Sequence, residues 1–425
     1  MSGSATHRPP ARWLVAVPPA RRLAYAVAME TPALRIVDDP TSEAVPADMR
    51  AWVIRPERLG EPIDAMQLET VEVPAPGPGE VLVRVMAAGV NYNLVWAAMG
   101  KPVSIFRYTG DDFHIGGSDA SGIVAAVGPG VKRWKPGDEV VIHCNQSCGE
   151  CPECNGLDPM ACSEQKIWGY ETNWGSFADY TRVQAQQLVP KPKHLSWEEA
   201  ASYALVYFTA YRMLVDQAGV QAGDNVLVWG AGGGLGSMAL QLCRLYGANA
   251  VAVVSSEDKI DLCKRLGAAA VIDRREFDLV DRDSGESNIA EMKRFGKTIR
   301  TATGGRDVDI VFEHVGAATF PTSVFVCKTF GKVVICGATS GFSLNFDVRY
   351  LWMRQKSIIG SHFANAYQAT RANQLIIERK VMPVLMRTFP FDECPVPHQM
   401  MRENAHLGKM VVLVGAEEPG LGVSG

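Results

Sequence analysis

The chain lacks long hydrophobic runs, an excess of either charge and a disulfide framework. No apolar run approaches the ~20 residues that span a bilayer. The 425 residues carry a net charge of −4 at pH 7, which gives no basic surface for nucleic acid or an anionic membrane. The 10 cysteines are scattered apart from one cluster, as expected in a reducing compartment. We therefore expect a cytoplasmic protein without nucleic-acid or membrane partners, and the length suggests about two domains.

The first 48 residues are expected to form a disordered extension. Arginines surround the apolar run 13–17, which Pro18 and Pro19 then interrupt. A targeting sequence is the less favoured alternative, because this run is too short. Globular structure is expected to begin near Met49.

Two kinds of secondary structure follow one another along the rest of the chain. Short β-rich runs at 81–86 and 139–143 each follow a Pro/Gly turn, which is typical of a β-rich domain. Ser196, with Glu199 three residues later, predicts a capped helix start. From there strands are expected to alternate with helices, at 225–229, 250–254, 270–272, 308–312 and 332–336. This alternation indicates a parallel, doubly wound sheet, and the strand expected at 409–414 returns to the first domain.

A glycine-rich turn, Gly230-Ala-Gly-Gly-Gly-Leu-Gly236, joins a predicted strand to a predicted helix. Ala231 replaces the first glycine of the full G-x-G-x-x-G pattern, so a tight turn without a ligand is the alternative. Glycine nevertheless lets the backbone approach a pyrophosphate, and the helix N-terminus offers free N–H groups. The turn predicts a dinucleotide site at Gly233, Gly234, Leu235 and Gly236.

The end of the second strand of this domain indicates NADPH rather than NADH. A carboxylate there would bind the ribose hydroxyls and repel a 2′-phosphate. The chain instead has Ser255, Ser256 and Lys259, with Arg274 after the third strand. Glu257 and Asp258 lie close enough to leave NAD open. His314 follows the fourth strand, and we expect it near the nicotinamide.

Four cysteines have the spacing of a closed tetrahedral zinc site. They are separated by two, two and seven residues, within a lobe expected at 144–165: Cys148, Cys151, Cys154 and Cys162. We predict a structural zinc, and a lobe that stays reduced and empty is the alternative.

The cysteine lobe, the glycine turn and the order of elements resemble the medium-chain dehydrogenase/reductase superfamily from Ala51 onward. The resemblance implies an α/β fold, with a GroES-like β-rich catalytic domain (49–195 and 366–425) and a Rossmann domain (196–365). Zinc alcohol dehydrogenases hold a catalytic zinc with a cysteine and a Gly-His-Glu motif, whereas the matching positions here are Asn91 and 117–119. Amide and hydroxyl groups are poor zinc ligands. We therefore expect metal-free hydride transfer to an alkene conjugated to a carbonyl.

Several stretches resemble a narrower family, the crotonyl-CoA carboxylase/reductases. The most specific are Trp168-Gly-Tyr-Glu-Thr172 and Gly360-Ser-His-Phe-Ala-Asn365. The resemblance implies that hydride from NADPH adds to the β-carbon of an enoyl-CoA, and that the resulting carbanion attacks CO2 to give an alkylmalonyl-CoA. It implies four CO2-handling residues: Asn91, Tyr170, Glu171 and His362.

The chemistry of these side chains suits that assignment. CO2 binds weakly, so it needs directed donors where charge develops. Asn91 and His362 could supply them, and Glu171 could orient His362 directly or through a water. Each also has a plainer interpretation: an Asx turn for Asn91, a solvated carboxylate for Glu171 and a core histidine for His362.

Other assignments stay open in the sequence. Arg349, Tyr350 and Lys356 could meet the phosphates or adenine of CoA, although a solvated basic face is the alternative. Rival functions are a plain enoyl-thioester reductase, a nonenzymatic NADPH-binding protein and, last, a zinc alcohol dehydrogenase. A homodimer or homotetramer is expected, because superfamily members commonly pair through the nucleotide domain.

Overall fold

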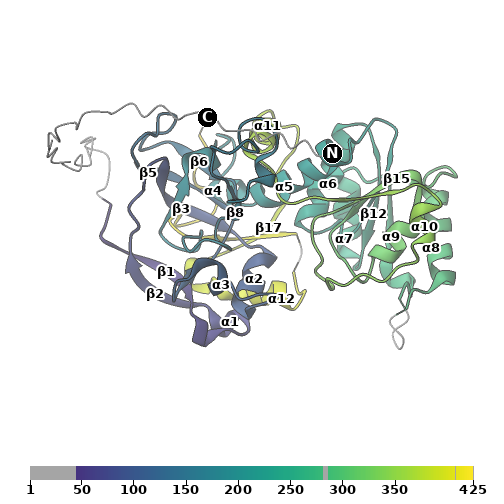
Figure 1. Ribbon diagram of the computed structural model, residues 1–425, viewed down its shortest axis with the longest axis horizontal. Helices are drawn as coiled ribbons and strands as arrows, with labels where there is room; N and C mark the ends of the chain where they lie inside the picture. The colour runs from purple at the N-terminus through teal and green to yellow at the C-terminus, as the bar shows by residue number, and fades with distance from the viewer. Residues whose placement is uncertain (1–44, 281–285, 407, 425) are drawn as a thin grey trace, which may run out of the picture. The chain divides into compact units, whose positions relative to one another are not determined.

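The fold begins with a β-rich part, as expected. The computed structural model describes residues 45–280, 286–406 and 408–424 (Figure 1); most of the predicted extension, 1–44, lies outside them. β1 (Asp48–Ile54) pairs with β2 (Gln67–Glu72) and β4 (His114–Ile115). The first strand thus begins within one residue of the predicted Met49.

A seven-stranded sheet carries the first group of candidate site residues. Its central strand, β3 (Glu80–Gly89), pairs with β5 (Ala120–Val127), β9 (Tyr180–Gln184) and β18 (Lys409–Leu413), all antiparallel. The sheet is completed by β6 (Glu139–Ile142), β10 (Leu188–Pro190) and β17 (Leu385–Phe389). Pairing of β18 with β3 confirms that the last predicted strand returns to the first domain. Helix α2 (Tyr92–Met99) starts directly after β3, and α12 (Pro395–Arg402) precedes β18.

The second sheet is the predicted parallel one. Its order is β13-β12-β11-β14-β15-β16, and every neighbouring pair is parallel. From β11, successive strands are added first on one side (β12, β13) and then on the other (β14, β15, β16), so the strand order reverses between β11 and β14. Doubly wound sheets bind dinucleotides at such a point. The strands are β11 (Asn225–Val228), β12 (Asn249–Val254), β13 (Ala270–Asp273), β14 (Val308–Glu313), β15 (Cys327–Ile335) and β16 (Ser357–Gly360).

Helices bury both faces of this sheet, because alternate strand residues point to opposite sides. Val226 and Val228 share one apolar cluster with α5 (Ala204–Tyr211) and α6 (Gly234–Leu245). Leu227 belongs to another, with residues of α8 (Ile289–Ala302) and α9 (Phe320–Val326). The remaining elements used below are α4 (Trp197–Ala201), α7 (Asp258–Arg265), α10 (Arg349–Trp352) and α11 (Ala366–Ile377).

Local sequence signals locate the helix starts well. Ser196 is the N-cap of α4, its Oγ accepts from the Glu199 amide at 3.3 Å, and Glu199 Oε2 accepts from the Ser196 amide at 2.9 Å. This is the predicted capping box. No helix in the described ranges is long and apolar enough to cross a membrane.

Candidate active site and cysteine lobe

The glycine turn opens α6 at the carboxyl end of β11. Gly233 is the N-cap of α6, so the amides of Gly234, Leu235 and Gly236 form its first turn and have no intrahelical acceptor. A Cβ on Gly236 would lie 2.5 Å from both Ala231 Cα and Gly230 O. Backbone atoms therefore leave no room for any side chain there, and free amides face a site suited to a pyrophosphate.

A cavity of about 470 Å³ lies beside this turn. Lys259 crosses the turn, since its Cγ would lie 2.7 Å from a Cβ on Gly232. The same cavity is lined by the predicted Ser255 and Ser256, and also by Arg387 and His406 from the last part of the chain. Arg387 and His406 were missed in the sequence because they lie more than 100 positions beyond the glycine turn. Asp258 also lines the cavity, and the exposed Arg274 does not.

His314 directly follows β14, where the strand order reverses, and it lies against the glycine turn. Its Nε2 is 2.9 Å from the Trp229 carbonyl, which can only accept, so Nε2 carries the proton. Burial lowers the pKa of His314, opposed by the Glu313 charge and the Trp229 carbonyl, so the ring is neutral at pH 7. A Cβ on Gly230 would lie 2.9 Å from His314 Cε1.

The loop that carries His314 is fixed by a fully buried carboxylate, Glu313. Its oxygens accept from the amides of Val315 (2.7 Å) and Gly316 (3.2 Å) and from the hydroxyls of Thr319 (2.9 Å) and Ser323 (2.6 Å). These four donors satisfy both buried carboxylate oxygens and hold the loop in place.

Asn91 is held in a buried polar cluster. It is the N-cap of α2, yet its side chain makes no capping bond. Its Nδ2 donates to Asp119 Oδ2 at 3.1 Å and to Gly89 O at 3.3 Å, and its Oδ1 accepts from Lys409 Nζ at 2.5 Å. The Asx-turn alternative therefore does not describe this side chain, which points to other strands instead of its own helix.

Tyr170 and Glu171 lie in a tight turn that packs on the loop between β4 and β5, which leads to Asp119. Gly117 N donates to Gly169 O at 3.1 Å, and a Cβ on Gly169 would lie 1.9 Å from Gly117 O. Glu171 Oε2 accepts from the Ile167 amide at 2.8 Å. Burial raises the pKa of Tyr170 to about 12, so its hydroxyl stays protonated.

His362 follows the edge strand β16, and its ring contacts Phe363 with centroids 4.3 Å apart. Although part of the residue faces solvent, protein packed around the ring lowers its pKa, and the Arg212 charge lowers it further. The imidazole is thus neutral at pH 7. Within the described ranges, no hydrogen bond or ion pair joins His362 to Asn91 or Glu171.

The loop after His362 is tied to the cysteine lobe. Asn365, the N-cap of α11, donates from Nδ2 to Asp158 Oδ1 at 3.1 Å. The other Asp158 oxygen accepts from Arg212 Nη2 at 2.7 Å, and Arg212 Nη1 donates to Gln368 at 3.0 Å. These bonds connect the lobe, α11 and the helix after α5 around the predicted His362 site.

The three candidate CoA contacts have local partners. Arg349 pairs with Asp347 at 2.6 Å, Tyr350 packs edge-on against Phe325, and Lys356 Nζ donates to Val324 O at 2.6 Å. Lys356 thus caps the end of α9. Each of the three side chains therefore makes a contact within the protein. A CoA role for them stays a prediction.

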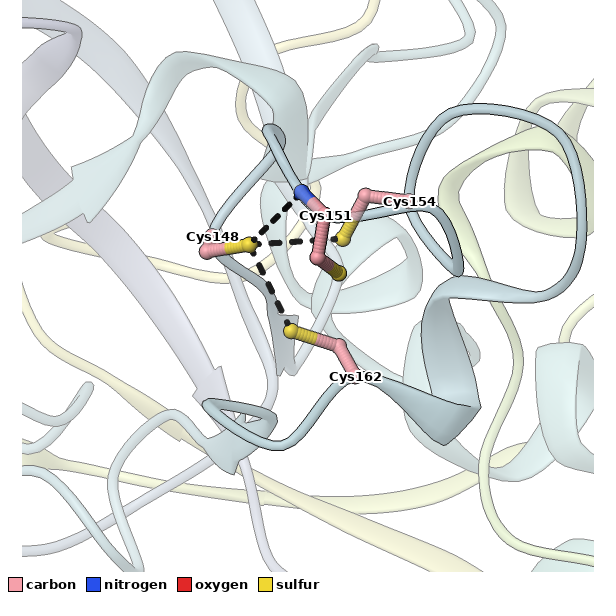
Figure 2. Close-up of side chains that lie close together, drawn as sticks. All are labelled: Cys148, Cys151, Cys154 and Cys162. Atoms are coloured by element: carbon pink, nitrogen blue, oxygen red, sulfur yellow. Dashed lines mark hydrogen bonds between the residues drawn. The ribbon is translucent and has the colours of Figure 1, made fainter. Parts of the chain in front are cut away.

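The four predicted cysteines come together in one cluster (Figure 2). Their sulfurs all lie within 4.8 Å of one another; Cys148 Sγ is 3.9 Å from Cys154 Sγ and 3.6 Å from Cys162 Sγ. Zn–S bonds of ~2.3 Å in a tetrahedron place sulfurs about 3.8 Å apart. The amides of Glu150 and Cys151 donate to Cys148 Sγ and lower its pKa to about 7. The residues fit a structural zinc, which they would hold without an open position for substrate.

Replacing Cys162 by Ser should remove one bound zinc per chain. Because binding to a structural site adds to folding free energy, we also expect the Tm to fall by about 5 °C or more. Elemental analysis and calorimetry measure the two effects. Cys144→Ala is the matched control, since Cys144 is buried nearby but outside the cluster; equal zinc loss from both variants would contradict the assignment.

The geometry defines a class of protein, and comparison with known sequences agrees. Residues 77–193 match the alcohol dehydrogenase GroES-like domain, and residues 234–378 match the zinc-binding dehydrogenase family. A GroES-like domain beside a Rossmann domain is the arrangement of the medium-chain dehydrogenase/reductase superfamily, as expected from the sequence.

Closer relatives narrow the class. The chain is 57% identical to the crotonyl-CoA carboxylase/reductase of Cereibacter sphaeroides over 89% of this chain and 90% of that one. It is also similar to the crotonyl-CoA carboxylase/reductase AntE in complex with NADP (46% identity, TM-score 0.84, 90% and 98% covered). The 2-octenoyl-CoA carboxylase reductase CinF in complex with NADP and 2-octenoyl-CoA is 40% identical, with a TM-score of 0.86 and coverage of 89% and 91%.

The chain belongs to the crotonyl-CoA carboxylase/reductase family. This confirms the family expected from the motifs, and with it an oxidoreductase. The NADP in the related structures confirms the choice of NADPH over NADH.

Proposed function

We propose that the protein catalyses the NADPH-dependent reductive carboxylation of an α,β-unsaturated acyl-CoA, crotonyl-CoA or a near homologue, to an alkylmalonyl-CoA. The observation that carries this is the presence of Asn91, Tyr170, Glu171 and His362 in a chain of this family. Hydride from NADPH adds to the β-carbon, the thioester carbonyl delocalises the resulting α-carbanion, and the carbanion attacks CO2. No metal is needed for this step.

We assign the CO2-handling task to side chains that are neutral at pH 7. Asn91 can release its longest bond, 3.3 Å to Gly89 O, and donate to a CO2 oxygen instead. A neutral His362 offers one further N–H. The protonated Tyr170 hydroxyl and the surrounding apolar packing help to keep water from the carbanion, because protonation competes with carboxylation. Glu171 acts by fixing its turn, through its bond to the Ile167 amide.

The cavity beside the glycine turn is assigned to the 2′-phosphate of NADPH. Lys259 and Arg387 bring positive charge to it, while Ser255 and Ser256 bring hydroxyl donors. His406 reaches the same cavity from the other domain. We assign the pyrophosphate to the first turn of α6 and the nicotinamide to the region beside His314.

The test is a product analysis with NADPH and crotonyl-CoA, with and without bicarbonate. Ethylmalonyl-CoA formed only with bicarbonate supports reductive carboxylation. Butyryl-CoA in both reactions would instead indicate the plain reductase. The absence of NADPH oxidation with crotonyl-CoA and with longer enoyl-CoA substrates would indicate a nonenzymatic NADPH-binding protein.

We propose a homodimer or homotetramer that pairs through the edge strand β16. An unpaired strand edge invites pairing with another strand, and three large apolar side chains near this edge are strongly exposed: Phe330 (65%), Trp352 (63%) and Met353 (62%). Replacing Ile358 of β16 by Lys should lower the mass measured by light scattering toward the 46.1 kDa of one chain. An unchanged mass would place the interface elsewhere.

We also propose domain boundaries at residues 196 and 366 and a cytoplasmic location. The boundaries flank the parallel sheet, which spans 225–360. The location is supported by 10 free cysteines, which suit a reducing compartment.

A further inference from the structure

Asn91 lies against a buried ion pair that the family resemblance did not assign. Lys409 Nζ is 2.8 Å from Asp119 Oδ2, and the side chains are 3% and 0% exposed. The ammonium also donates to Asn91 Oδ1 at 2.5 Å. Removing two charges from water costs several kcal/mol per ion, and apolar replacements are often no less stable. A buried pair of this kind therefore calls for an explanation other than stability.

The pair connects segments that are far apart in the sequence. Lys409 is the first residue of β18, Asp119 precedes β5, and Asp119 Oδ1 accepts from the Leu205 amide in α5 at 2.9 Å. A bridge between Gly233 and Gly408 brings the chain beside Lys409 to the glycine turn. The Lys409 side chain accordingly lies near the turn, with Cδ 3.7 Å from a Cβ on Gly234.

The hydrogen bonds fix which way the Asn91 amide faces. Lys409 has donors only, so the oxygen of Asn91 must face the ammonium. The Asp119 carboxylate accepts only, so the nitrogen must face it. A cation on the amide oxygen also draws electron density from the nitrogen, which makes its N–H groups stronger donors.

We infer that Lys409 and Asp119 are positioning residues for carboxylation, which orient and polarise the Asn91 carboxamide toward CO2. The inference rests on the proposed function and goes beyond it, because it assigns a task to two residues that do not touch the reacting atoms. It predicts that loss of the ammonium affects the fate of the carbanion more than its formation.

The experiment measures the ratio of alkylmalonyl-CoA to acyl-CoA, and the bicarbonate KM, for native enzyme and Lys409→Met. We expect the carboxylated fraction to fall about 10-fold while NADPH oxidation continues. Lys409→Arg, which keeps the charge, should recover part of the ratio. Lys191→Met is the matched control, since Lys191 is equally buried and pairs with Glu139 outside the site; it should lower stability and leave the ratio unchanged.

Unpaired Asp119 could prevent Lys409→Met from folding. The double variant Lys409→Met/Asp119→Leu removes both charges and avoids that cost; the same fall in ratio is expected. A folded variant with the native ratio and bicarbonate KM would overturn the inference, as would an equal change in Lys191→Met. If native enzyme itself makes no alkylmalonyl-CoA, the proposed function fails instead.

Discussion

His362→Asn is expected to lower the carboxylated fraction of product about 100-fold while hydride transfer continues. One directed donor to developing charge is worth about that factor. The shorter asparagine amide cannot place an N–H where the imidazole ring places it. The pKa of His362 lies below its ordinary value, so the ring does not change its charge above pH 7. Titration of His362 should therefore not alter the native product ratio above pH 7. Product masses at saturating bicarbonate give the ratio directly.

Glu171→Ala should move the ratio in the same direction, since the turn at Ile167 loses its carboxylate bond. His194→Asn is the control, because His194 is partly buried in the turn before α4 and belongs to no assigned site. If the ratio stays native in both His362→Asn and Glu171→Ala, the assignment of the CO2 site is wrong.

Gly236→Ala is expected to weaken NADPH binding more than 100-fold, an order-of-magnitude estimate from the sub-van-der-Waals contact. The new Cβ would meet Ala231 Cα and Gly230 O at 2.5 Å, so the turn must open and the amides of α6 leave their positions. The enhancement of NADPH fluorescence on binding gives the Kd.

Gly296→Ala is the matched control. A Cβ there, inside α8, would meet nothing closer than 3.6 Å, and alanine favours a helix interior. Its NADPH affinity should equal that of the native enzyme. Native affinity in Gly236→Ala would show that the pyrophosphate binds elsewhere.

The features that sequence predicts here are local or periodic. The strands of the parallel sheet, the capping box at Ser196 and the four-cysteine spacing each depend on residues within a few positions of one another. Each is found in the structure close to its expected place, and only the ends of strands differ: β15 begins at Cys327, five residues before the predicted strand.

The features that sequence misses depend on long-range contacts. Lys409 and Asp119 are 290 positions apart, and a lysine at a strand start looks like an ordinary solvated residue. Lys356 likewise has a partner that its place in the sequence does not reveal, because its ammonium caps a helix 32 positions away. A charge can be read from the sequence, whereas only the fold shows whether it is solvated or paired, and with which residue.

Pairing of β18 with β3 also sets an order for how the protein matures during synthesis. Asp119 leaves the ribosome 290 residues before Lys409, and the strands of the parallel sheet are translated in between. The sheet that carries Asn91 cannot gain β18 until the whole parallel sheet has been translated, although domains generally fold as they emerge. Until then Asp119 lacks the Lys409 ammonium that pairs with it in the finished sheet. The parallel sheet, encoded between the two pieces, can fold first and hold them near each other.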